Sequence, residues 1–191
     1  RNALRLSLNT VTVRLAQDIG MPLIGEYAHR FGVYDELPNY LSYALGAGET
    51  TVMRMATAYS MIANGGRRVK PTLIDRIQDR YGHTIFKHDA RECRGCDAPG
   101  GWKNQTEPQL IDRREQVLDT MTAYQMTSML EGVVQGGTAI AVKEVGKPIA
   151  GKTGTTNEAK DAWFVGFSPD IVVGIYLGYD KPRPLGHGNA A

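Results

Sequence analysis

The apolar residues of this chain are spaced differently in its first and last thirds, and this change of period limits the fold. From residue 1 to about 66 they recur three or four positions apart, as they do between Val11 and Ile19, which predicts helices. A further helix is expected to begin after a cap at Thr50 or Thr51 and to end at the Asn-Gly-Gly of residues 64–66. Residues 1–66 therefore predict a helical lobe.

The last third predicts an antiparallel sheet. Apolar runs at 149–153, 163–167 and 171–177 have the length of strands, and the Ser-Pro-Asp turn at 168–170 joins the last two as a hairpin. A helix with one apolar face, at residues 123–134, precedes them. An order of helices first and sheet last predicts an α+β fold.

The middle of the chain has a different character. After a strand-like stretch, residues 88–114 lose all periodicity, so we expect an exposed, mobile loop or insertion there. The sequence thus divides into the helical lobe of residues 1–66, strands with an irregular insertion at 67–121, and a helix with the antiparallel sheet at 122–191.

Charge and composition narrow the classes of function. The chain has 191 residues, with 22 Lys and Arg against 20 Asp and Glu, a net charge of +2 that gives no electrostatic case for nucleic acid. Its longest apolar run, residues 171–179, is far shorter than the roughly 20 residues of a membrane span. The 4 histidines have no metal-ligand spacing, so we expect neither a metal nor a cofactor. The chain opens at Arg1 without the pattern of a signal peptide, and we expect it to be a piece of a longer protein.

The first candidate motif is Lys152-Thr153-Gly154-Thr155-Thr156, at the end of a predicted strand. Gly154 lets a ligand approach the backbone closely, because it has no side chain. A lysine beside hydroxyls and free strand-edge N–H groups suits a carboxylate and a developing oxyanion. The alternative is an ordinary solvated strand edge.

The second candidate is Ser7-Leu8-Asn9, just ahead of the first clear helix. Taken alone, Ser7 or Asn9 is better explained as the cap of that helix. The motif gains weight only in combination with the one at Lys152.

Together the two motifs carry a resemblance. A Ser-x-Asn at a helix junction followed far downstream by Lys-Thr-Gly-Thr on a strand is similar to the penicillin-recognising serine transferases and hydrolases. The strings at residues 44–66, 133–138, 150–156 and 161–166 resemble the transpeptidase domain of class A penicillin-binding proteins. The resemblance covers nearly all of the chain except residues 88–114. It implies a β-lactamase/D,D-transpeptidase-like fold, an antiparallel sheet flanked by helices plus a helical lobe.

The chain departs from that family at the nucleophile. The family acylates the serine of a Ser-x-x-Lys motif, which lies upstream of Ser-x-Asn. None of the serines here is followed three places later by lysine: Ser7, Ser42, Ser60, Ser128 and Ser168. We therefore expect the chain to be the C-terminal portion of the domain, with the nucleophile on an upstream segment of the same protein.

The resemblance also implies roles for single residues. Ser7 would be the last proton carrier to the expelled amine, and Lys152 would orient it. Asn9 would bind the substrate amide or hold the missing lysine. The hydroxyls of Thr153 and Thr155 would hold the terminal carboxylate, and the N–H of Thr155 would be one oxyanion donor.

The function implied is that of a peptidoglycan D,D-transpeptidase, which cross-links stem peptides through a serine acyl-enzyme and is a target of β-lactam antibiotics, hence relevant to antibiotic resistance. Its location would be periplasmic or extracytoplasmic, on a parent anchored to the inner membrane and carrying a glycosyltransferase domain.

Because that compartment favours oxidation, a Cys93–Cys96 disulfide is expected first, with zinc and redox roles as alternatives. The competing functions are a non-catalytic sensor or scaffold of the same fold and an unrelated α+β domain with chance motifs.

A first prediction follows from the missing nucleophile. The isolated chain should take up no covalent label from a reporter-tagged penicillin, because none of its serines has the activating lysine. Mass spectrometry of the intact chain after incubation measures this directly. An adduct on any of the serines would contradict the assignment of the nucleophile to an upstream segment.

Overall fold

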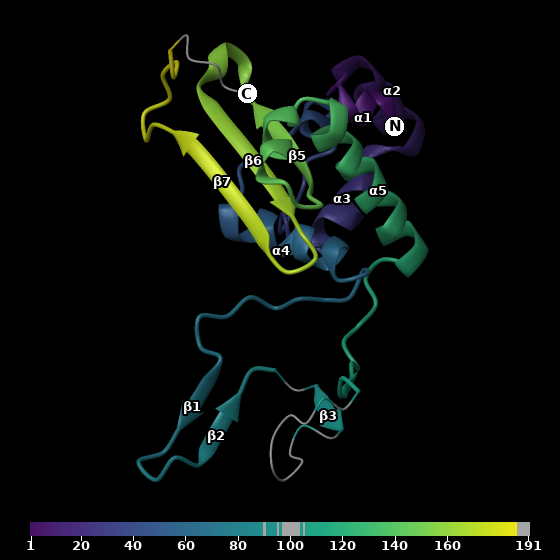
Figure 1. The fold of residues 1–191 in the computed structure, drawn as a ribbon. Helices are drawn as coiled ribbons and strands as arrows, with labels where there is room; N and C mark the ends of the chain where they lie inside the picture. Colours follow the sequence, from purple (N-terminus) through teal and green to yellow (C-terminus); the bar gives the residue numbers. More distant parts are fainter. Residues whose placement is uncertain (90, 95, 97–103, 105, 187–191) are drawn as a thin grey trace. The chain divides into compact units, whose positions relative to one another are not determined.

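The computed structural model describes residues 1–89, 91–94, 96, 104 and 106–186 (Figure 1). The helices are α1 (Asn2–Arg5), α2 (Asn9–Ile19), α3 (Met21–Arg30), α4 (Val52–Ala63) and α5 (Thr120–Gly136), with 3-10 turns η1 (Leu41–Leu45), η2 (Ile140–Val145) and η3 (Asn157–Ala159). The strands are β1 (Arg76–Gln78), β2 (Thr84–Lys87), β3 (Glu92–Arg94), β4 (Gln109–Ile111), β5 (Ala150–Thr155), β6 (Asp161–Phe167) and β7 (Val172–Gly178). None of the helices in these residues is long and apolar enough to cross a membrane.

The chain divides into two compact units. The first unit joins residues 1–69 to residues 116–191, so the N-terminal helices and the C-terminal sheet belong to one body. The second unit consists of residues 70–115. Both candidate motifs lie in the first unit.

The sheet of the first unit has the order β5-β6-β7 and is antiparallel throughout. The three predicted strands and the hairpin are confirmed, and the Ser168 N–H donates to the Ile171 carbonyl at 2.9 Å across the turn. In the register of β5 and β6, Lys152 faces Val165 and Thr153 faces Phe164. Among the described residues β5 has a strand on one side only, so it forms an edge of this sheet.

The core of the first unit lies between this sheet and helices α4 and α5 (Figure 1). Leu130, Ala150 and Phe167 form one buried cluster, against which Tyr59 of α4 packs. The apolar face predicted for residues 123–134 is confirmed, since its members Ala123, Leu130, Val133 and Val134 are buried. This arrangement of helices on an antiparallel sheet is the predicted α+β architecture.

The ends of α4 follow the sequence signals. Thr51 caps the helix by accepting a hydrogen bond from the Arg54 N–H at 3.1 Å. Gly65 and Gly66, with φ of 67° and 85°, supply the left-handed stop that was predicted. Gly66 is also required by packing, because a Cβ there would lie 2.0 Å from the Leu118 carbonyl oxygen.

Helix α2 was predicted from its apolar stripe, and the helix is confirmed. Its stripe nevertheless faces outward: Val11, Leu15 and Ile19 are 45%, 56% and 46% exposed. The spacing of these residues therefore predicted the helix correctly, but the apolar face that it defines is not buried within this unit.

The second unit corrects one expectation. Residues 88–114 were expected to be irregular, but β3 and β4 pair there as antiparallel strands, with Cys93 opposite Leu110. Each strand has 3 residues, which is too short to produce a recognisable period. Part of the rest of this stretch lies outside the described residues. So does His187, one of the 4 histidines of the sequence.

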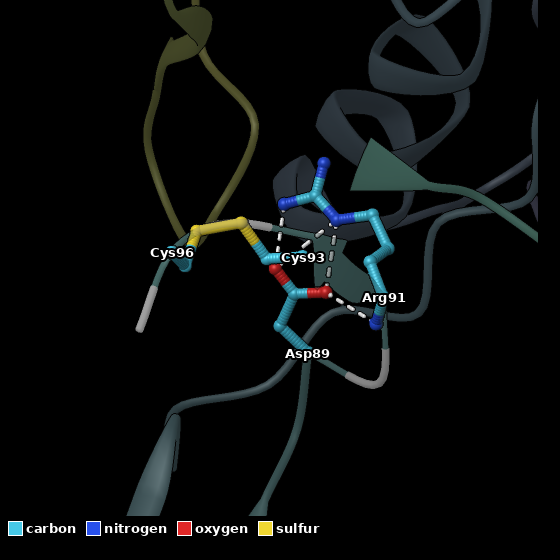
Figure 2. The surroundings of a disulfide bond; sticks show 4 residues. All are labelled: Asp89, Arg91, Cys93 and Cys96. Atoms are coloured by element: carbon cyan, nitrogen blue, oxygen red, sulfur yellow. Dashed lines mark hydrogen bonds and ion pairs between the residues drawn. A yellow bond between two sulfur atoms is a disulfide. The ribbon is translucent and has the colours of Figure 1, made fainter. Parts of the chain in front are cut away.

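A disulfide joins Cys93 to Cys96, and Figure 2 shows it beside an ion pair between Asp89 and Arg91. A side-chain hydrogen bond from Arg91 is the main cause of a pKa of Asp89 well below its ordinary value. The pair lies directly ahead of β3, which begins at Glu92. Both cysteines lie in the second unit and so do not belong to the same body as the two candidate motifs.

A second prediction concerns glycine in the sheet. A Cβ at Gly166 would lie 2.6 Å from the Phe164 ring and 3.0 Å from the Ala150 carbonyl oxygen. Gly166→Ala should therefore lower the free energy of unfolding by about 1–3 kcal/mol. The matched control is Gly132→Ala in α5, where a Cβ meets nothing within 4 Å and the change should be neutral or stabilising by up to about 1 kcal/mol. Urea denaturation of both variants measures the difference, and equal stabilities would contradict the close packing of Phe164.

Candidate active site

Ser7 occupies a strained turn between α1 and α2. Its φ is 56°, in the left-handed region that non-glycine residues rarely adopt. The turn is closed by backbone hydrogen bonds from the Ser7 N–H to the Leu4 carbonyl, at 3.3 Å, and from the Leu8 N–H to the Ala3 carbonyl, at 2.9 Å. These bonds fix the direction in which the Ser7 side chain leaves the backbone.

The capping interpretation of the Ser-x-Asn motif is wrong. The cap of α2 is Leu8, with no side-chain hydrogen bond to the first turn, and Asn9 is already the first helical residue. Because the chain turns at Ser7, its hydroxyl is directed to another part of the unit instead of to the amides of α2.

That other part is the end of Lys152. Its Nζ donates to Ser7 Oγ at 2.8 Å and to the Thr153 carbonyl at 2.7 Å, and it lies 3.5 Å from Thr153 Oγ1. Ser7 and Lys152 are 145 residues apart in sequence, so the contact is entirely tertiary. The structure thus brings together the leading residues of the two motifs.

Lys152 is partly buried, and this desolvation lowers the pKa of its amine. Its hydrogen-bond partners are neutral oxygens, and within the described residues no ion pair of this lysine is seen. A desolvated ammonium held only by neutral acceptors is well suited to an incoming anion.

The edge of β5 supplies further donors. The Thr156 N–H donates to the Asp161 carbonyl of β6 at 3.1 Å. In an antiparallel pair, every second residue directs its backbone N–H and C=O groups to the neighbouring strand. The backbone groups of Thr155 and Thr153 therefore point away from β6. The bond from Lys152 to the Thr153 carbonyl agrees with this direction. A Cβ at Gly154 would come no closer than 3.4 Å to its nearest neighbour, the Trp163 Cβ, so packing within the unit does not require glycine there.

Asn9 and Thr138 differ in how they are bonded to the candidate site. Asn9 is exposed, and in the described part of the chain no hydrogen bond joins its side chain to Ser7 or Lys152. Thr138, which the sequence analysis did not single out, lies with its Oγ1 2.7 Å from Thr153 Oγ1. The only signal for it was its place after two glycines in the string at residues 133–138.

No ligand set for a metal is found among the described residues. The adjacent aromatic residues Trp163 and Phe164 of β6 pack differently, and Phe164 packs against the buried cluster of Val133, Val134 and Ala139. Trp163 packs instead on Tyr176, with ring centroids 4.9 Å apart.

Known proteins are similar to this chain in sequence and in fold. Residues 1–183 match the family described as the penicillin binding protein transpeptidase domain. Penicillin-binding protein 1A of Rickettsia bellii is 45% identical over 190 residues, and that of Neisseria gonorrhoeae is 44% identical over 188 residues, each covering 97% of this chain. The crystal structure of penicillin-binding protein 1A from Haemophilus influenzae superposes with a TM-score of 0.81 at 31% identity, over 98% of this chain and 31% of that one.

The chain therefore belongs to the penicillin-binding protein transpeptidase domains, and the resemblance seen in the sequence is confirmed. Within that family it is a transpeptidase domain of the 1A type of class A penicillin-binding proteins. It spans 24% of the length of the Rickettsia relative and 21% of the Neisseria relative.

A third prediction concerns the Lys152 amine. It should titrate below 10.5, the ordinary value for lysine, because burial disfavours the charged form. The folded pKa is then lower than the unfolded one, so the free energy of unfolding should rise as the pH increases from the lowered pKa toward the ordinary value. An NMR titration of the Lys152 Cε resonance, assigned by its loss in Lys152→Met, measures the midpoint. A midpoint at or above 10.5 would show that the amine is not desolvated.

Proposed function

We propose that this chain is part of a peptidoglycan D,D-transpeptidase that cross-links stem peptides through a serine acyl-enzyme and is acylated by β-lactams. The observation that carries the proposal is the 2.8 Å contact between Lys152 Nζ and Ser7 Oγ, which joins the Ser-x-Asn and Lys-Thr-Gly-Thr motifs. The acylated serine belongs to a Ser-x-x-Lys motif on an upstream segment of the same protein, since none of the serines here has that context.

The proposed role of Ser7 follows from its hydrogen bonding. Because its oxygen accepts from the Lys152 ammonium, its own proton is free to point elsewhere. In acyl transfer the expelled amine needs a proton, and the Ser7 hydroxyl donates it. The adjacent ammonium then stabilises the negative charge that develops on Ser7 Oγ during that transfer.

The edge of β5 is the proposed carboxylate and oxyanion site. The Thr153 and Thr155 hydroxyls bind the terminal carboxylate of the stem peptide, or the equivalent carboxylate of a β-lactam. The Thr155 N–H, directed away from β6, is one oxyanion donor, and the upstream serine would supply the other. Gly154 leaves the backbone accessible between them, and Asn9 binds the substrate amide or the upstream lysine.

The proposed substrates and location follow from the family. The substrates are peptidoglycan stem peptides and the inhibitors are β-lactams, whose carboxylates complement the Lys152 charge. A structure of PonA1 from Mycobacterium tuberculosis in complex with penicillin V has the same fold, with a TM-score of 0.72 at 23% identity. The location is extracytoplasmic, on a parent anchored to the inner membrane, and the Cys93–Cys96 disulfide is in keeping with an oxidising compartment.

A fourth prediction tests Lys152 in the intact parent protein. Lys152→Met keeps the length of the side chain but removes its charge, so the rate of acylation by a labelled penicillin should fall by about 10²–10³-fold. The measurement is the second-order rate constant of covalent labelling.

The matched control is Lys181→Met, which removes an exposed lysine beyond β7 and should leave the rate unchanged. If the unaltered parent takes no label at all, the non-catalytic sensor or scaffold becomes the better description. If it is labelled and Lys152→Met is labelled at the same rate, the role given to Lys152 is wrong.

A further inference from the structure

Thr138 lies between α5 and η2 and is bonded to both halves of the candidate site. Its Oγ1 lies 2.7 Å from Thr153 Oγ1, and its backbone N–H donates to the Arg5 carbonyl at 3.2 Å. Arg5 ends α1, two residues before Ser7, whereas Thr153 directly follows Lys152 on β5. One residue therefore connects the segment that carries the serine to the strand that carries the lysine.

We propose that Thr138 is a positioning residue for carboxylate recognition: its hydroxyl donates to Thr153 Oγ1, which leaves the Thr153 proton for a carboxylate ligand. The inference rests on the proposed function, in which Thr153 binds the terminal carboxylate. It adds to that function a residue that acts through Thr153 and does not itself contact the ligand.

If Thr153 is to donate to a carboxylate, its hydrogen-bond inventory sets this direction for the 2.7 Å contact with Thr138. A hydroxyl has one proton and two acceptor lone pairs. Lys152 Nζ, 3.5 Å from Thr153 Oγ1, can only donate. If Thr138 donates as well, both lone pairs of Thr153 are occupied, and its single proton points to the open edge of β5. A carboxylate has no proton to offer, so only this arrangement lets Thr153 itself donate to the ligand.

The glycine before Thr138 makes the connection sterically possible. A Cβ at Gly137 would lie 2.3 Å from the Arg5 carbonyl oxygen, which is a severe overlap with backbone. The absence of a side chain at position 137 lets α1 approach closely enough for the Thr138 N–H to reach Arg5. The backbone bond anchors Thr138, and its side chain is then held against Thr153.

The test uses the full-length parent and two ligands that differ only at the carboxylate: a penicillin and its methyl ester. Thr138→Val keeps the shape and the backbone N–H of the residue but removes the hydroxyl. It should lower the acylation rate constant for the penicillin about tenfold and that for the ester less than about twofold. Thr138→Ser keeps the hydroxyl and should restore the penicillin rate to within about twofold of wild type.

The control is Thr127→Val on α5, which removes a hydroxyl bonded at 3.0 Å to the Ala123 carbonyl and should change neither rate. Thermal unfolding identifies variants that do not fold, and Thr138→Ala then serves as the second variant without a hydroxyl. Equal losses for the penicillin and the ester would indicate a merely structural role and overturn the inference, as would no loss. A wild-type parent that is never acylated would instead refute the proposed function, so the two failures are distinguishable.

Discussion

The close approach of α1 to the C-terminal end of α5 determines the geometry of the whole site. It depends on the missing side chain at Gly137, where any Cβ would overlap the Arg5 carbonyl. Leu4 of α1 packs against both buried clusters of the unit, so the same approach is stabilised by apolar burial. The position of Ser7 is therefore fixed by packing at a distance, and its contact with Lys152 is a consequence of how the core assembles.

Both partners of that contact are in locally unfavourable states. A non-glycine residue in the left-handed region, as Ser7 is, costs about 1–2 kcal/mol. Partial burial also disfavours the charge on Lys152, as its lowered pKa indicates. A hydrogen bond from a charged group contributes about 1.5–3 kcal/mol net, which is of the same size as the strain at Ser7 alone. The surrounding fold maintains the pair, as is common where strained residues serve a function.

The fold of the first unit could largely be predicted from the sequence, because α5 and the strands β5 to β7 are long enough to show their period. The strands β3 and β4, of 3 residues each, could not. The capping alternative for Ser7 could not be excluded from the sequence, because no sequence pattern reveals a left-handed backbone at a serine. Its pairing with Lys152 came from the resemblance alone, since 145 residues separate them and no local rule links them. The place of Thr138 after two glycines was its only signal, and that place does not reveal the contact with Thr153.

The outward-facing stripe of α2 has a consequence for handling the chain in solution. Val11, Leu15 and Ile19 recur on successive turns and expose about half of their surfaces. Natural monomers seldom leave such apolar side chains together in water. We therefore expect self-association, more than low thermodynamic stability, to limit work with the recombinant chain on its own. The self-association should increase with protein concentration and decrease when a mild detergent covers α2.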